Sequence, residues 1–246
     1  METPALNACT GWETAIRCHP GLQREVNEDA YIARPDLCLW AVADGMGGHA
    51  RGDYASRSIV EALDALPATP EPDRAERVIA ALQAAHHRIQ EKSREIHEPV
   101  GSTVVAFVAM GGAAEALWVG DSRLYRLREG VLEQLSHDHS MVQEWIDQGM
   151  VRPEEAEQLP NANVITRAVG MDESLQIDRR RFEIASGDLF LLCSDGLTRE
   201  LADEELAAML SGSPSLESAA DRLLEAVLAR GAHDNVTLIL LRCCDP

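Results

Sequence analysis

The stretch Leu39-Trp40-Ala41-Val42-Ala43-Asp44-Gly45-Met46-Gly47-Gly48-His49 decides the fold class of this chain. An unbroken apolar run leads directly into an aspartate and a glycine-rich turn. A short apolar run that turn residues close is typical of a strand buried in a sheet. The aspartate therefore stands at the end of the strand, where its carboxylate can leave the core.

This apolar run extends over 37–43, and further strand-length runs cover 103–109, 117–120, 189–193 and 236–241. Residues 124–135 are expected to form a hairpin around the turn 128–130. Acidic residues stand at the ends of these strands: Asp44, Asp121 and Asp195 close a strand, Asp234 opens one, and Asn27-Glu28-Asp29 opens another. In an antiparallel sheet, the end of one strand lies beside the start of its neighbour. These carboxylates could therefore gather at one edge.

Helical periodicity fills the intervening segments. Apolar residues at spacings of three and four predict an amphipathic helix over 73–96, and a shorter helix is expected over 51–66, with the break at 67–72. A second long helix is predicted over 214–230, with Ser213 as its N-cap and Gly231 after its last turn.

The order of these elements predicts an α+β fold. Strands and helices come in blocks without strict alternation, which favours antiparallel sheets with helix pairs on their outer faces. A helical insert is expected over 139–159. With 246 residues, of which 46% are hydrophobic, the chain is expected to form a single domain over 1–246.

Composition limits the partners. A net charge of −19 argues against nucleic acid and anionic membranes as partners. The excess of carboxylates is either a solvated acidic surface or, in part, a set of cation ligands. The N-terminus shows no secretion signal, and Cys38 and Cys193 within apolar runs are expected to be buried thiols. A cytoplasmic location is therefore expected.

The clustered carboxylates predict a metal site. Several carboxylates at one place repel each other unless cations neutralise them, and Mg²⁺ or Mn²⁺ prefers such oxygen ligands. Any one Asp-Gly pair can equally be an ordinary turn, but several acidic strand ends in one chain favour the metal site.

A resemblance to a known family rests on six motifs in order. They are 24–29 (REVNED), 42–49 (VADGMGGH), 101–103 (GST), 119–123 (VGDSR), 192–197 (LCSDGL) and 233–237 (HDNVT). This series resembles the PP2C-type (PPM) protein phosphatases in their compact bacterial form, over about residues 12–243. The resemblance implies two packed antiparallel β-sheets flanked by pairs of helices, an α-β-β-α sandwich, with a helical flap over about 136–168 beside the active site.

The resemblance also implies roles for individual residues. Asp44 would bridge two metal ions, and Gly45 would offer its carbonyl to one of them. Asp195 and Asp234 would complete the ligands of the other ion, and Asp121 would help to hold a third, weaker one. Glu28 and Asp29 would orient metal-bound waters, and Arg24 would clamp the phosphate with its planar fork.

One position departs from the pattern of other branches, which place a histidine directly after the Asp-Gly pair as a candidate general acid. Met46 stands there in this chain, and His49 follows Asp44 by five residues. His49 is therefore either an acid or substrate-recognition residue or a structural residue beside a glycine-rich turn.

The implied activity is hydrolysis of phosphoserine and phosphothreonine in proteins by a metal-bridging hydroxide at a binuclear Mn²⁺ or Mg²⁺ centre. A phosphorylated protein would be the substrate, a Ser/Thr kinase or its targets would be partners, and the chain would act as a monomer. Some bacterial members serve type VI secretion. Two alternatives remain open: an inactive module that binds phosphoproteins, and a structural metal-binding domain without turnover.

Overall fold

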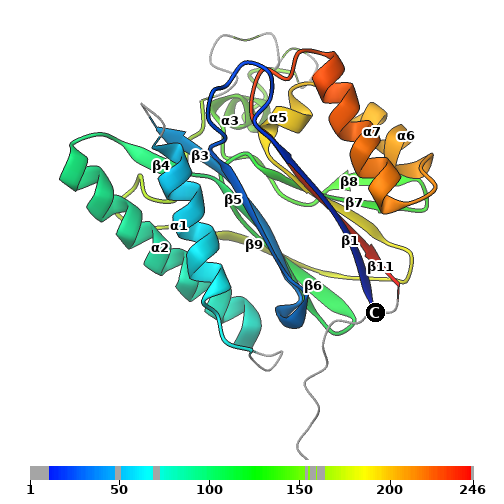
Figure 1. The fold of residues 1–246 in the computed structure, drawn as a ribbon, viewed down its shortest axis with the longest axis horizontal. Coiled ribbons are helices and arrows are strands. Elements are labelled where there is room, and N and C mark those ends of the chain that lie inside the picture. The colour runs from blue at the N-terminus through cyan, green and yellow to red at the C-terminus, as the bar shows by residue number, and fades with distance from the viewer. Residues whose placement is uncertain are drawn as a thin grey trace, which may run out of the picture.

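Two antiparallel sheets pack face to face in the computed structural model, and helices cover both outer faces (Figure 1). The structure describes residues 11–47, 51–68, 73–152, 155, 159 and 164–244. The strands are β1 (Trp12–His19), β2 (Asp29–Arg34), β3 (Leu39–Gly47), β4 (Val100–Ser102), β5 (Val104–Met110), β6 (Ala113–Val119), β7 (Arg123–Arg128), β8 (Val131–Gln134), β9 (Asp178–Glu183), β10 (Leu189–Cys193) and β11 (Val236–Cys243). The helices are α1 (Gly52–Asp64), α2 (Arg74–Ile96), α3 (Met141–Asp147), α5 (Asp195–Thr198), α6 (Asp203–Ser211) and α7 (Leu216–Ala229), with a 3₁₀ turn η1 (Pro35–Leu37).

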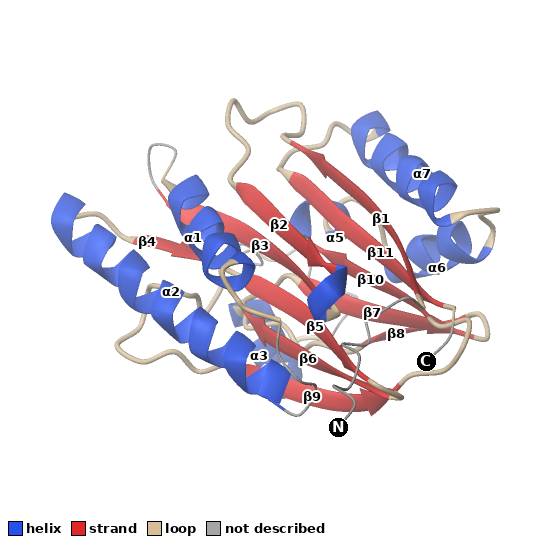
Figure 2. Ribbon diagram, turned by 60° about the horizontal axis from the view of Figure 1, so that its bottom comes forward, coloured by secondary structure: helices blue, strands red, loops and turns tan. Residues whose placement is uncertain are grey.

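The strand order defines the two sheets. One runs β1-β11-β10-β7-β8, and the other runs β2-β3-β5-β6-β9 with β4 paired to β3. The pair α1 and α2 covers the second sheet, and α6 and α7 lie on the opposite side of the sandwich, against the first sheet (Figure 2). The predicted α+β sandwich with outer helix pairs is therefore confirmed.

Strand β3 shows how the sequence produces these layers. Trp40 and Val42 pack into the core between the sheets, whereas Leu39, Ala41 and Ala43 face the α1–α2 pair. Both faces of the strand are thus buried, which explains its continuous apolar run. The ring of Phe107 lies 4.8 Å from that of Phe190 across the two sheets, so large side chains join the layers.

The helix predictions hold with one correction. The helices expected over 51–66 and 73–96 are α1 and α2. The predicted helix at 214–230 begins later, at Leu216, and its N-cap is Ser215, whose side chain accepts a hydrogen bond from the Ser218 amide. Ser213 instead donates to the Met209 carbonyl at the end of α6, so the prediction of Ser213 as the cap was wrong.

The predicted strands are all present, but three strands were missed, namely the short β4 and the edge strands β1 and β9. Strand β1 mixes polar and apolar residues at one edge of its sheet, and β9 carries a run of arginines at the edge of the other. Edge strands are exposed on one side and tolerate charged residues, so they lack an apolar run.

The two cysteines that were predicted to be thiols differ in the structure. Cys193 is a buried thiol as predicted, but Cys38 is disulfide-bonded, so the expectation of a thiol there was wrong. Sequence spacing alone does not reveal which cysteines meet in space. Among the residues that the structure describes, no helix is long and apolar enough to pass through a bilayer.

The segment expected to form a flap contains α3, which Ser140 caps by accepting a hydrogen bond from the Gln143 amide. The segment returns antiparallel to its own start, because the Met141 amide donates to the Val164 carbonyl and the Thr166 amide donates to the His139 carbonyl. The part of the expected helical insert that follows residue 152 falls largely outside the described residues.

Candidate active site

The acidic strand ends meet at one end of the sandwich. Asp29, which opens β2, lies directly opposite Asp44 in β3. Asp195 follows β10 and Asp234 precedes β11, and these two strands are antiparallel neighbours. Asp121 lies in the turn between β6 and β7. The antiparallel register therefore brings together residues that are up to about 200 positions apart.

All of these carboxylates except that of Asp29 border one open cleft of about 410 Å³. Its lining includes most of the predicted site residues, namely Arg24, Glu28, Asp44, Gly45, Asp121, Asp195 and Asp234. It also includes residues to which sequence reasoning assigned no role: Met46, Gly47, Thr103, Ile165, Arg199 and Asn235. Ile165 belongs to the predicted flap segment, so this segment does border the cleft.

Glu28 lines the cleft, whereas Asp29 lies outside its lining. Asp29 is buried and accepts a 2.8 Å hydrogen bond from the Ser194 hydroxyl. The Glu28 carboxylate accepts a 2.8 Å bond from the Gly52 amide at the start of α1, and its backbone carbonyl accepts one from the Ser56 hydroxyl. Both acidic side chains are therefore held in place by the scaffold.

The backbone at Asp44 is fixed from the neighbouring strands. Its amide donates to the Thr103 hydroxyl oxygen at 3.1 Å, and its carbonyl accepts from the Thr103 amide and the Ser102 hydroxyl. Thr103 also shares a 2.7 Å hydrogen bond with Ser122, the residue after Asp121. This chain of bonds ties the two acidic turns together.

The space at position 45 admits only a glycine. A Cβ at this position would lie 2.1 Å from the carbonyl oxygen of Gly52, so no larger residue fits without moving the backbone. The close approach of these two segments keeps the turn after Asp44 next to the start of α1.

Burial and mutual repulsion disfavour negative charge on these groups. Burial, followed by the negative charges of Asp29 and Asp195, holds the pKa of Asp44 well above its usual range. Burial and the nearby Asp195 raise the pKa of Asp121 to about 8, and burial raises that of Asp29 to about 7. Burial likewise raises the pKa of Asp195, although Arg199 opposes the shift. A cation in this cleft would relieve the repulsion.

Two arginines reach Asp234 from different elements. Arg24 donates to Asp234 Oδ2 at 2.8 Å, and Arg199 contacts the same oxygen at 3.1 Å. Arg199 also forms an ion pair with Asp195, four residues before it. Sequence reasoning missed Arg199, although the spacing of four residues from Asp195 was a signal for a contact on one helical turn.

Asn235 anchors the loop that carries Arg24. Its side-chain amide donates to the carbonyls of Pro20 at 2.8 Å and Val26 at 3.1 Å, and its Oδ1 accepts from the Glu28 amide at 2.8 Å. The motif around Asp234 drew attention to this residue, but only the tertiary structure shows what its side chain holds.

The donor set suits a hard divalent cation. The cleft offers carboxylate and carbonyl oxygens, and Asp195 Oδ1 is buried without a hydrogen-bond partner. Such oxygens are the ligands that Mn²⁺ and Mg²⁺ prefer. Among the described residues, no three acidic, histidine or cysteine side chains are placed so that together they could hold a metal ion. Arg24 pairs with Asp234, and Arg199 pairs with both Asp195 and Asp234. The residues fit a metal that keeps several waters.

The role considered for His49 stays a prediction, because this residue lies outside the described residues. His86, in contrast, is buried on α2, where its Nδ1 accepts a hydrogen bond from the Gly170 amide.

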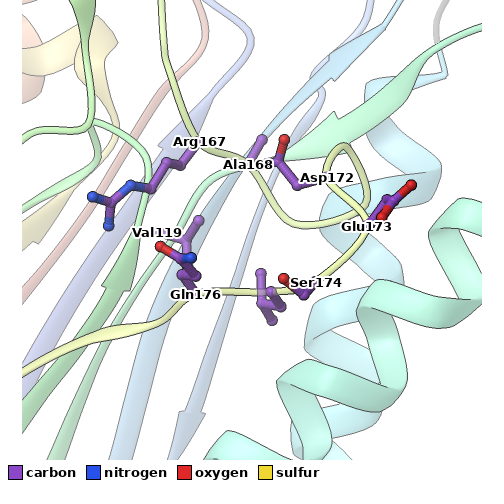
Figure 3. Close-up of a pocket in the computed structure, with 8 residues that line it drawn as sticks. Val119, Arg167, Ala168, Asp172, Glu173, Ser174 and Gln176 are labelled. Atoms are coloured by element: carbon purple, nitrogen blue, oxygen red, sulfur yellow. The ribbon is translucent and has the colours of Figure 1, made fainter.

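A second cavity, of about 270 Å³, lies next to the flap segment and is lined in part by Val119, Asp172 and Glu173 (Figure 3). Arg167 extends away from these two acidic residues in Figure 3 and pairs with Asp178 at 3.0 Å. None of the predicted site residues lines this cavity, so the acidic cleft is the candidate active site.

Comparison with known proteins agrees with this geometry. The family model described as protein phosphatase 2C matches residues 23–237. Serine/threonine protein phosphatase PstP of Mycobacterium tuberculosis is 37% identical over 235 residues, which cover 94% of this chain but 45% of that protein. The chain thus spans about half the length of this curated relative.

Two solved structures resemble the whole fold. PppA, described as a key regulatory component of T6SS in Pseudomonas aeruginosa, is 42% identical with a TM-score of 0.87, over 96% of this chain and 99% of that one. The catalytic domain of PstP, solved in complex with two manganese ions, is 34% identical with a TM-score of 0.84, over 95% and 99%. With a family match across most of its length, the chain belongs to the protein phosphatase 2C family.

Proposed function

We propose that this chain is a metal-dependent protein phosphatase that hydrolyses phosphoserine and phosphothreonine. The observation that carries the proposal is the cleft in which Asp44, Asp195 and Asp234 face Arg24 and Asp121. The PstP catalytic domain, with its two manganese ions, supports a binuclear centre of Mn²⁺ or Mg²⁺.

In this proposal Asp44, the Gly45 carbonyl, Asp195 and Asp234 hold two ions, and Asp121 helps to hold a third, weaker one. Bound ions would supply an acidified water molecule and neutralise charge on the phosphoryl oxygens. Arg24 stands at the rim with its side chain 54% exposed, so its guanidinium can turn from Asp234 to two phosphate oxygens. Glu28 and Asp29, held by backbone and hydroxyl groups, orient the waters.

Hydrolysis of a phosphopeptide tests this function. The wild-type protein in Mn²⁺ is expected to release phosphate from phosphoserine and phosphothreonine peptides, and Asp44→Ala is expected to lose several orders of magnitude in turnover. Its fold should survive, because Asp44 lies at the edge of the core. Circular dichroism controls for folding. Turnover of Asp44→Ala close to wild type would place the reaction elsewhere.

The same assay decides the alternative of an inactive phosphoprotein-binding module. Such a module would bind a phosphopeptide and release no phosphate in any metal. The phosphatase names of the relatives support the active alternative.

We further infer that the substrates include a Ser/Thr kinase or its targets, and that the chain acts as a cytoplasmic monomer. The relationship to PppA supports a regulatory role of this kind. Dephosphorylation of a kinase encoded near this chain's gene, and molecular mass by light scattering, would test these points.

A further inference from the structure

Arg199, which no sequence motif predicted as a site residue, contacts two carboxylates of the cleft. Its guanidinium contacts Asp195 and, at 3.1 Å, Asp234 Oδ2. These are the two carboxylates that, under the proposed function, ligate one of the metal ions. Arg24 contacts Asp234 alone. Arg199 is thus a cation shared between both proposed ligands.

The backbone places Arg199 next to both carboxylates. Its backbone amide donates to the Asp195 carbonyl at 2.8 Å, so the short helix α5 places both side chains on one turn. Asp234 comes to the same place from the start of β11, because β10 and β11 are paired. The side chain of Arg199 is 34% exposed, which leaves room for it to move into solvent.

A metal ion and a guanidinium compete for the same carboxylate oxygens. Metal binding requires Arg199 either to leave the carboxylates or to stay as a second positive charge beside a divalent ion. Both routes weaken metal binding. We propose that Arg199 is a positioning residue that pairs with Asp195 and Asp234 in competition with the metal, and so lowers the affinity of this site for Mn²⁺. This proposal rests on the proposed function.

Calorimetric titration of the purified protein with Mn²⁺ tests the proposal. Removing a unit charge next to a divalent ion is expected to tighten binding roughly tenfold in Arg199→Ala. Arg199→Lys should fall between wild type and Arg199→Ala, because an ammonium keeps the charge but cannot span two carboxylates. Arg24→Ala should tighten binding less, because Arg24 touches one ligand.

The matched control is Arg222→Ala, which removes the same charge from an exposed helical position. Arg222 donates to the Ser213 hydroxyl and makes no ion pair with Asp195 or Asp234. Its Mn²⁺ affinity should equal that of wild type, whereas an equal gain in affinity would reduce the effect to overall charge and overturn the proposal.

Urea unfolding gives a second measurement independent of activity. In EDTA, Arg199→Ala should unfold at a lower urea concentration than wild type, because Asp195 and Asp234 lose a neutralising partner. In saturating Mn²⁺ the gap should close, because tighter binding stabilises the variant more. Unchanged or weaker Mn²⁺ affinity of Arg199→Ala would overturn the inference alone. Absence of Mn²⁺ binding by wild type would overturn it together with the proposed metal site.

Discussion

Replacing Asn235 with alanine should both destabilise the protein and weaken substrate binding. Asn235 is 6% exposed, and the three hydrogen bonds of its side chain hold Pro20, Val26 and Glu28, which flank Arg24 in the sequence. The substitution leaves two carbonyls and one amide near the cleft without these partners. The loop would then keep fewer contacts with the turn that carries Asp234, among them the hydrogen bond from the Leu22 amide to the Ala232 carbonyl.

The magnitude follows from these bonds. A hydrogen bond contributes a net ~0.5–1.5 kcal/mol, so the loss of three predicts a decrease of roughly 2–4 kcal/mol in the free energy of unfolding. A displaced Arg24 would lose part of its interaction with the substrate phosphate, both in the ground state and in the transition state. We therefore expect KM for a phosphopeptide to rise about tenfold, with a smaller change in kcat.

Urea unfolding and steady-state kinetics in saturating Mn²⁺ measure the two effects. Asn27→Ala is the matched control, because Asn27 lies in the same loop but makes different hydrogen bonds. Its side chain accepts from the Asp29 amide at 3.1 Å and donates to the sulfur of Cys18. Its KM should change by less than about threefold. Wild-type KM in Asn235→Ala, with a stability loss below about 0.5 kcal/mol, would refute the anchoring function.

Three further predictions concern the cleft. EDTA should abolish activity, and Mn²⁺ or Mg²⁺ should restore it while Ca²⁺ should not, because Ca²⁺ takes more ligands at longer distances; full activity in EDTA would exclude the metal mechanism. Arg24→Ala should raise KM roughly 10- to 100-fold, since charged hydrogen bonds contribute ~1.5–3 kcal/mol, and Arg24→Lys should recover part of the loss; an unchanged KM would make Arg24 a surface residue. Asp121→Ala should retain two tight Mn²⁺ sites by calorimetry yet show a low kcat that excess Mn²⁺ does not restore. Loss of a tight site would instead assign Asp121 to the main pair of ions.

Local sequence patterns predicted most of the architecture. The apolar runs and helical spacings located α1, α2, β3, β5, β10 and β11, because the burial of a strand or of one helix face leaves a repeat in neighbouring residues. The patterns failed where burial is partial, as in the edge strands β1 and β9. They also failed at the cap of α7, where Ser213 and Ser215 are both chemically suitable.

The sequence by itself also determined which carboxylates stand at strand ends, and the alternation of antiparallel strands made their convergence predictable. Only the tertiary structure shows which arginines contact these carboxylates and which side chain holds the Arg24 loop. Arg24 contacts Asp234 across 210 positions, and Asn235 holds the Arg24 loop across a similar separation. Such contacts depend on the register of β1 with β11 and on side-chain directions, neither of which leaves a periodic signal in the sequence. Arg199 shows the same limit, because its spacing from Asp195 is local whereas its contact with Asp234 arises from strand pairing.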